Sequence, residues 1–503
     1  MKTAPHSTAQ SAIATAAIAA ASVAQWHAQY DVIVVGFGGA GACAAIAAAD
    51  AGSSVLICDV ASGSGGSTAL SSAELYLGAG TRVQKACGYN DDVEAMYNYL
   101  MQSNGPEADS AKTRAYCEGS VDHFNWLVDL GVSFNDTEFK ARAIVATTDD
   151  GLLYTGSEKA YPYVDSIAPA PRGHNLAIKG DHGGPLFMQI LTAAAIERGV
   201  EISYETRALR LIEDSGEVVG LVVRSNMQER YIACNQGVIL CAGGFVMNRE
   251  MLAQYAPDLM RCNIPIGNAG DTGSGILIGQ GMGAALNNMH QGFVSLPFYP
   301  PSSLTYGIFI NAHGKRFINE DCYHGRVGAH VLQQPPGPVY LLLSVEDYGN
   351  YETRSYLGAE VAATGETLTE LLAELDVPEE QLKRTVELYN SHAEQRSDPE
   401  FHKAGEWLKP LSAPYVALDC TPGRGVNMPY FTLGGLETRV SGEVLAETGA
   451  VIPGLYAAGR NASGVPRRAD GYASGISVGD ASFSGRMAGA ASGARKKIKG
   501  KKV

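Results

Sequence analysis

A buried strand that runs directly into a glycine-rich turn constrains the fold of this chain more than any other feature. The apolar run 31–35 ends at Gly36, and the sequence GFGGAG leads into an alanine-rich helical stretch that reaches residue 51. Gly36 permits the tight turn, Gly38 lets the backbone approach a pyrophosphate, and Gly41 lets the helix pack closely on the strand. The N–H groups at the start of the helix then face the phosphates. The pattern predicts a Rossmann-like dinucleotide-binding fold.

Two features that follow this unit support the same interpretation. A second apolar run, 54–58, ends in Asp59, at the separation of about 20 residues where an acidic side chain accepts from the ribose hydroxyl. The segment 62–68, with the sequence SGSGGST, comes next. Its glycines and hydroxyls could wrap a pyrophosphate and the edge of the cofactor, so we expect a binding loop there.

The composition narrows the class of protein. The chain has 503 residues and 59 glycines, but only 18% of its residues are charged, which favours a large α/β enzyme with many tight turns. A net charge of −14 disfavours nucleic acid as a partner, because phosphate binding requires a basic face. The nine cysteines contain no CxxC pair and the eleven histidines no HExxH pattern, so we expect no metal.

The two ends of the chain differ in composition from the rest. No apolar run reaches the roughly 18 residues that a membrane span requires. Residues 1–29 are alanine-rich and predict a frayed or helical leader of a cytoplasmic protein, with a weak signal peptide as the alternative. Residues 491–503 carry six Lys and Arg side chains. This basic tail is either solvated or in peripheral contact with anionic lipid, which would associate the protein with a membrane.

Further elements are expected between these ends. A helix is predicted over 186–198, and two short strands are predicted over 218–223 and 231–234. A buried strand over 237–241 then ends in Ala242, Gly243 and Gly244, so it should reach the cofactor. The sequence GDTGSG at 270–275 is expected to open a helix that runs through residue 285.

The amino-acid composition changes at about residue 286. Aromatic residues and prolines follow, and then a charged helical pair over 367–395. Glycine-rich motifs resume only after Pro414. We therefore expect a nucleotide-binding domain in two parts, 30–285 and 414–490, with a second domain inserted over 286–413.

The motifs together resemble one family. GFGGAGACAAIAAADAG, GGSTALSSAE, ILCAGGF, GDTGSG, GKRFINE, FTLGGL and GLYAAGR are similar, in this order over about residues 30–490, to those of the fumarate reductase/3-ketosteroid dehydrogenase flavoprotein superfamily. The resemblance implies an α/β fold in which a Rossmann-like FAD-binding domain carries an inserted α+β capping domain, with FAD bound non-covalently. The cofactor-binding residues it implies are Gly36, Gly38, Gly39, Ala40, Gly41, Asp59, Val60, Ser64, Gly65, Gly66, Ser67, Thr68, Ala208, Ala242, Gly243, Gly244, Asp271, Gly459, Arg460, Ser474, Gly475, Ser477 and Val478.

The resemblance also bears on the substrate. Dicarboxylate reductases of this superfamily hold carboxylates with an Arg and a His, and this chain has Tyr472 and Phe431 at those places. Replacing a bidentate guanidinium clamp by aromatic residues leaves an apolar slot lined by hydroxyls. We expect a steroid or another apolar ketone as substrate. The aromatic residues that could line the slot are Tyr76, Phe245, Phe298, Tyr430 and Phe431.

Tyr323, Tyr472 and Ser474 look like the catalytic set of the 3-oxo-5α-steroid Δ4-dehydrogenases. The resemblance implies that a double bond is introduced at C4–C5, with a hydride moving from C5 to flavin N5 and a proton leaving C4. Tyr472 and the Gly475 N–H would polarise the ketone. Ser474 would accept the proton and Tyr323 would relay it. A helix that begins near Ile476 would direct its positive end at the flavin.

Other functions remain open at this point. The same site could act in reverse, as a reductase of 3-oxo-Δ4 steroids or bile acids, or introduce a Δ1 double bond. A fumarate-type enoate reductase would need an anion clamp from Arg326, Arg424, Arg460 or Arg467. A flavoprotein that acts only as a binding module is the non-enzymatic alternative. The electron acceptor, a quinone or another molecule, is not indicated by the sequence.

Overall fold

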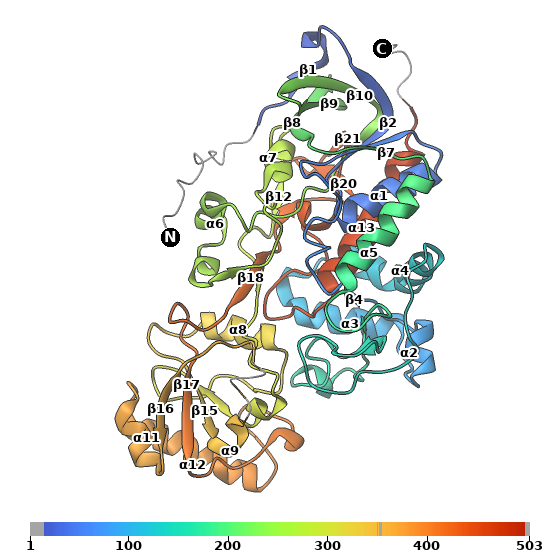
Figure 1. Ribbon diagram of the computed structural model, residues 1–503. Coiled ribbons are helices and arrows are strands. Elements are labelled where there is room, and N and C mark those ends of the chain that lie inside the picture. Colours follow the sequence, from blue (N-terminus) through green and yellow to red (C-terminus); the bar gives the residue numbers. More distant parts are fainter. Residues whose placement is uncertain (1–14, 350, 352–354, 498–503) are drawn as a thin grey trace.

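The computed structural model describes residues 15–349, 351 and 355–497, and a nine-stranded sheet occupies the upper part of the view in Figure 1. The strand order is β1-β8-β9-β10-β2-β3-β7, with β21 beside β10 and β20 beside β21. Strands β2, β3, β7, β10 and β21 run parallel. The bounds are β1 (Ile18–Ala19), β2 (Ala28–Val35), β3 (Val55–Cys58), β7 (Glu201–Ser203), β8 (Arg207–Asp214), β9 (Glu217–Ser225), β10 (Gln228–Leu240), β20 (Glu443–Leu445) and β21 (Val451–Ala457).

Helices α1 (Gly39–Asp50), α5 (Gly183–Glu197) and α13 (Ile476–Ala494) pack together beside this sheet. The contact between α1 and α13 is close because glycines face it: a Cβ on Gly489 would lie 2.1 Å from the Ala44 carbonyl oxygen. Strand β2, the turn and α1 form the unit that the sequence predicts over 31–51. The predicted α/β class with a Rossmann-like domain is therefore confirmed.

Three local expectations differ from the structure. Residues 15–29, predicted as a leader, add β1 to the sheet edge and place Trp26 against Gly220. The strands expected over 231–234 and 237–241 form one strand, β10, which shifts register between Cys234 and Gly237. Helix α7 (Ser274–Gln280) ends earlier than residue 285, because the chain turns back to pair β12 (Leu286–Asn287) with β19 (Gly435–Leu436).

Further helices and short strands surround the sheet. A three-stranded sheet has the order β4-β6-β5, and another has the order β11-β18-β13. The remaining elements of this larger body are α2 (Arg82–Ala86), α3 (Val93–Asn104), α4 (Ser110–Asp129), α6 (Arg249–Tyr255), β4 (Leu75–Tyr76), β5 (Leu152–Leu153), β6 (Gly173–His174), β11 (Ile264–Pro265), β13 (Gly292–Val294), β18 (Pro429–Thr432), and the 3₁₀ turns η1 (Ala20–Ser22), η2 (Gly105–Glu107), η3 (Tyr163–Asp165), η4 (Pro257–Arg261) and η7 (Gly459–Asn461).

A smaller body, at the lower left of Figure 1, is built on the antiparallel sheet β14-β15-β17-β16. Its apolar core, with Leu342, Leu371 and Leu382 among its members, is separate from the main core. Strand β17 pairs between β15 and β16, so this sheet extends beyond residue 413. The domain limits stay a prediction. The elements are β14 (Ile308–Ile310), β15 (Tyr340–Ser344), β16 (Val361–Gly365), β17 (Tyr415–Asp419), α8 (His324–Leu332), α9 (Val345–Tyr348), α11 (Leu368–Glu374), α12 (Glu379–Glu394), η5 (Ser302–Tyr306) and η6 (Gly405–Trp407).

Part of the predicted basic tail is bound to the larger body. Arg495 forms an ion pair with Glu217, and Lys497 lies 2.8 Å from Asp31. Lys499, Lys501 and Lys502 lie outside the described residues, so contact of the tail with lipid stays a prediction. Among the described residues, none of the helices combines the length and the apolar character that crossing a bilayer requires.

Candidate active site

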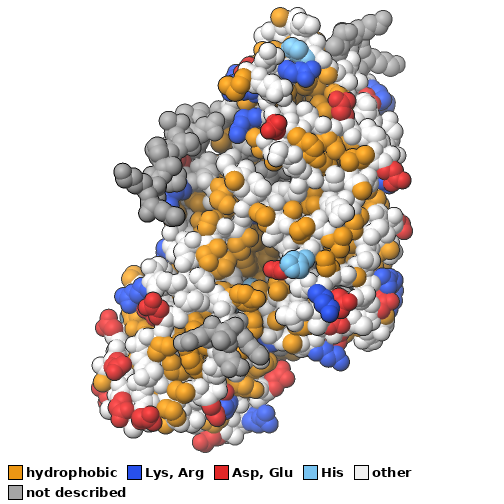
Figure 2. Space-filling model, viewed as in Figure 1, with side chains coloured by type: hydrophobic (Ala, Val, Ile, Leu, Met, Phe, Trp, Pro, Cys, Tyr) orange, Lys and Arg blue, Asp and Glu red, His pale blue; other side chains and the backbone are white. Residues whose placement is uncertain are grey.

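A cavity of about 880 Å³ opens where the parallel strands end. Residues just beyond the carboxyl ends of β2, β3, β10 and β21 line it, which is the usual ligand position in an open α/β sheet. Its volume lies within the range of roughly 300–1,000 Å³ found for small-molecule sites. Figure 2 shows apolar side chains gathered around the hollowed middle of the molecule.

The structure brings most of the predicted cofactor residues to this cavity. All of them line it except Gly41 and Gly244, which lie just behind the wall. A Cβ on Gly41 would come within 2.0 Å of the Gly36 carbonyl oxygen, and one on Gly244 within 2.7 Å of Thr432 Oγ1. These two glycines thus allow the close packing that shapes the cradle, the part of the cavity that the glycine turn and the loop 62–68 enclose.

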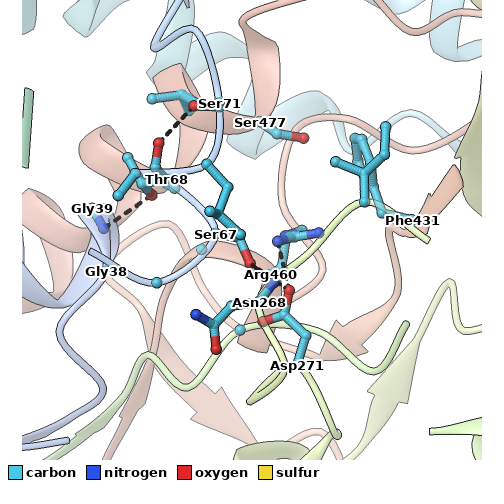
Figure 3. Close-up of a pocket in the computed structure, with 18 of the residues that line it drawn as sticks. Gly38, Gly39, Ser67, Thr68, Ser71, Asn268, Asp271, Phe431, Arg460 and Ser477 are labelled. Carbon is cyan, nitrogen blue, oxygen red and sulfur yellow. Dashed lines mark hydrogen bonds and ion pairs between the residues drawn. The ribbon is translucent and has the colours of Figure 1, made fainter. Parts of the chain in front are cut away.

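Polar contacts fix the loop around the cradle (Figure 3). Thr68 Oγ1 accepts a hydrogen bond of 3.1 Å from the Gly39 N–H, and Ser67 Oγ donates to Asp271 Oδ2 over 2.6 Å. Arg460 forms a 2.9 Å ion pair with the same carboxylate. These contacts hold the loop against the strand ends.

Asp59 lies where the sequence predicts, at the end of β3. Its Oδ2 accepts from the Phe37 N–H over 2.5 Å and its Oδ1 from the Ala61 N–H over 2.7 Å. Each carboxylate oxygen has further acceptor capacity, so the side chain can also accept from ribose hydroxyls.

The predicted catalytic residues meet at another part of the cavity. The hydroxyls of Tyr323 and Ser474 are hydrogen-bonded over 2.7 Å, although the residues are 151 positions apart. The Tyr472 hydroxyl donates to Ser477 Oγ over 2.9 Å. Among the described residues, no group accepts a hydrogen bond from the Gly475 N–H, and Gly475 adopts φ +86° as it caps α13.

Backbone contacts fix the position of Tyr323, which precedes α8. Its N–H donates to Ser157 Oγ over 3.1 Å. The Arg142 guanidinium donates to the carbonyl oxygens of Asp321 and Cys322, at 2.9 and 2.8 Å. The larger body thereby holds the start of α8 against the loop that carries Ser474.

Burial controls the ionisation of these groups. It raises the pKa of Tyr472 to about 12 and moves that of Tyr323 well above its usual value. Both phenols are therefore neutral donors near neutral pH. Burial also lowers the pKa of His324 to about 3, helped by Arg142, so this imidazole is uncharged.

The aromatic wall differs in part from the expectation. Phe431 lines the cavity and packs with Phe293, whose ring centroid lies 4.5 Å from that of Tyr472. The other four predicted aromatics do not line it. They serve elsewhere: Tyr76 donates to Glu158, Phe245 and Phe298 pack against Tyr255 and Phe309, and Tyr430 lies on β18 away from the cavity.

Several cavity residues were missed by sequence reasoning. They are Glu74, Ile144, Val145, Phe293, Ser295, Pro297 and His324. Glu74 belongs to the GGSTALSSAE motif, so its buried acidic position could have been noticed. The others come from segments without a motif, and only tertiary packing brings them to the cavity.

The four candidate arginines do not form an anion clamp. Arg460 alone of them lines the cavity, and it is paired with Asp271. Arg326 pairs with Asp470, Arg467 with Asp109, and Arg424 lies 3.8 Å from Asp419. Across the described part of the chain, no three His, Cys, Asp or Glu side chains are grouped to hold a metal ion.

A dinucleotide cradle at the strand ends, continuous with an apolar slot that carries hydroxyls, defines a flavin-dependent oxidoreductase. The sequence matches the FAD binding domain family over residues 31–476, and the chain belongs to that family. FAD is therefore its cofactor, as predicted. That FAD is bound non-covalently stays a prediction.

Known relatives match most of the chain. The fumarate reductase (cytochrome) of Shewanella frigidimarina is 28% identical over 92% of this chain and 77% of its own length. The 3-oxo-5-alpha-steroid 4-dehydrogenase of Comamonas testosteroni is 26% identical over 88% of this chain and 94% of its own length.

A solved structure is more similar. The 3-ketosteroid-Δ4-(5α)-dehydrogenase of Rhodococcus jostii, in complex with 4-androstene-3,17-dione, is 40% identical and superimposes with a TM-score of 0.90. The match covers 95% of this chain and all of that one. The predicted resemblance to the flavoprotein superfamily and its steroid branch is confirmed.

Proposed function

We propose that this protein removes hydrogen from C4 and C5 of 3-oxo-5α-steroids and leaves a C4–C5 double bond. The observation that carries this proposal is the 2.7 Å hydrogen bond between Tyr323 and Ser474 in a slot walled by Phe293 and Phe431. Similarity to a Δ4-(5α)-dehydrogenase over almost the entire chain supports it.

The first step is polarisation of the C3 ketone. The C4 proton is acidic only if negative charge on the ketone oxygen is stabilised, so donors must be directed at that oxygen. Tyr472 and the Gly475 N–H supply them. When the Tyr472 hydroxyl donates its hydrogen bond to the ketone oxygen, it no longer donates to Ser477. The Ser477 hydroxyl can then turn and donate to the phenol oxygen, since a hydroxyl both donates and accepts.

The second step is removal of the C4 proton. Ser474 accepts it while its own proton moves to Tyr323 along their hydrogen bond. FAD, when bound, supplies the acceptor for the hydride that leaves C5. The aromatic wall excludes water from the slot, which strengthens each hydrogen bond to the developing charge.

The wall also discriminates between substrate classes. A dicarboxylate would bring two charges to an aromatic face, and Arg460 is already engaged by Asp271. Leaving a carboxylate without a cationic partner in such a site costs several kcal/mol. The slot therefore favours a neutral ring system with one ketone.

Anaerobic absorption spectroscopy of the FAD-loaded protein tests the proposal. Addition of a 5α-3-ketosteroid is expected to bleach the flavin, and fumarate should not recolour flavin that dithionite has reduced. The absence of bleaching by any 5α-3-ketosteroid, together with recolouring by fumarate, would replace this function by a dicarboxylate reductase.

A further inference from the structure

Glu74 is an acidic side chain in the cavity wall that has no part in the steps above. It lines the same cavity as Tyr323, Tyr472 and Ser474, and it is only 3% exposed. Its Oε1 is buried without a hydrogen-bond partner among the described residues. A buried carboxyl without a partner destabilises the folded protein. Stabilisation of the fold therefore does not explain why an acidic residue stands here.

The backbone fixes Glu74 beside residues 471–475, the catalytic loop that carries Tyr472 and Ser474. A Cβ on Gly475 would lie 3.0 Å from the Glu74 carbonyl group, and the Gly475 carbonyl accepts from the Tyr76 N–H over 3.1 Å. Burial is the main cause of the raised pKa values of Tyr323 and Tyr472, but the charge of Glu74 also raises both. The carboxyl therefore lies within electrostatic range of the two phenols.

Within the described ranges, no cation neutralises Glu74. Among the described residues, it forms no ion pair with a Lys, Arg or His side chain. Arg460, on η7, is held by Asp271, and Glu158 is bonded to Tyr76 of β4. The titratable and charged groups nearest to it in the cavity wall are Tyr323 and His324 at the start of α8, Tyr472 of the catalytic loop and Arg460 of η7. Tyr76 of β4 follows it two positions along the chain.

We propose that Glu74 is the final proton acceptor of this site, taking up through Tyr323 the proton that Ser474 removes from C4. This inference rests on the proposed function. The C4 proton bonds to Ser474 Oγ, the Ser474 proton to the Tyr323 oxygen, and the Tyr323 proton to the Glu74 carboxylate. The electron pair of the C4–H bond becomes the new double bond as the hydride leaves C5 for oxidised FAD. In the opposite direction the protonated carboxyl supplies the proton.

The hydroxyls need such a partner because neither Ser474 nor Tyr323 can hold an extra proton near neutral pH. Burial raises the pKa of Glu74 to about 8. The carboxylate, which is the accepting form, therefore becomes populated as the pH rises through this value. Dehydrogenation should gain rate over the same interval.

Stopped-flow measurement of flavin reduction by a 5α-3-ketosteroid, across pH values on both sides of about 8, tests the role of Glu74. The rate of the native holoenzyme should rise with pH and then level off. In Glu74→Gln the rate should fall by about 10²-fold or more, and the rise of the rate with pH should disappear. Glu158→Gln, which changes a buried carboxyl outside the cavity, should keep this rise. A Glu74→Gln enzyme that retains the native rise with pH overturns the inference.

Thermal unfolding of the same holoproteins gives a readout that does not require activity. The unfolded chain loses the Glu74 proton near pH 4.5 and the folded chain near pH 8, so the folded protein loses stability as the pH rises between these values. The Tm of Glu74→Gln minus that of the native protein should therefore increase over this interval. A constant difference would contradict a buried, ionising carboxyl. If the native flavin is not reduced by steroid at any pH, the proposed function fails, whatever this second measurement shows.

Discussion

Two pairs of hydroxyls determine the chemistry of the site at the scale of single residues. Tyr323 is bonded to Ser474 and Tyr472 to Ser477, so one pair can move a proton while the other can donate to a carbonyl. The sequence predicted Tyr323, Tyr472 and Ser474 because they stand in motifs. It did not predict His324, whose burial depends on packing between distant segments, and Glu74 was missed although it stands in the GGSTALSSAE motif. Four predicted aromatic residues are buried but do not line the cavity, because an aromatic side chain is also stabilised by packing in the core.

Removal of the Tyr472 hydroxyl tests its role as a donor to the ketone. Tyr472→Phe should slow flavin reduction by steroid about 10²–10³-fold, since one hydrogen bond to the developing oxyanion is lost. FAD should remain bound. Stopped-flow absorbance gives the rate and the visible spectrum gives the FAD content. Tyr430→Phe, on a tyrosine outside the cavity, is the matched control, and equal rates in the two variants would exclude Tyr472 from this role.

Ser474 is expected to accept the C4 proton. Ser474→Ala should lower the rate of flavin reduction by about 10²–10⁴-fold, as is typical for loss of positioned proton transfer. Affinity for the steroid, measured by the perturbation of the flavin spectrum on binding, should change little. Ser391→Ala, in the smaller body, is the control. A Ser474→Ala enzyme that reduces its flavin at the native rate would show that another group accepts the proton.

At the scale of elements, the unit formed by β2, the glycine turn and α1 is the part that the sequence predicted best. Its glycines mark it in the sequence, because two of them avoid backbone clashes: a Cβ on Gly36 would lie 2.5 Å from the Cys241 carbonyl oxygen, and one on Gly41 2.0 Å from the Gly36 carbonyl oxygen. Strand β10 was predicted less well, since its length depends on pairing with β2, β9 and β21. Helix α7 ends where β12 must reach β19, a constraint that is invisible in the local pattern.

Gly41 provides a test of the cradle. In Gly41→Ala the added methyl would lie 2.0 Å from the Gly36 carbonyl oxygen, so the turn must shift. We expect the free energy of unfolding to fall by about 1–3 kcal/mol and FAD to be lost on gel filtration. Gly63→Ala, in the neighbouring loop, meets nothing within 4 Å and should retain FAD. Full FAD retention by Gly41→Ala would contradict the close packing described here.

At the scale of the whole molecule, the site depends on contact between the two bodies. Helix α8 carries Arg326 and His330, and both bind Asp470, two residues before Tyr472. Arg142 of the larger body holds the start of the same helix. These contacts bring Tyr323 to Ser474. The sequence indicated an inserted segment, but it could not indicate which of its faces would close on the cavity.

The position of the new double bond tests the account most directly. The FAD-loaded protein would be mixed anaerobically with a 5α-3-ketosteroid, and the product of a single turnover would be identified by mass spectrometry and NMR. We predict a 3-oxo steroid with the double bond at C4–C5, in an amount equal to the flavin reduced. A product with the double bond at C1–C2, or unchanged steroid beside oxidised flavin, would contradict the claim.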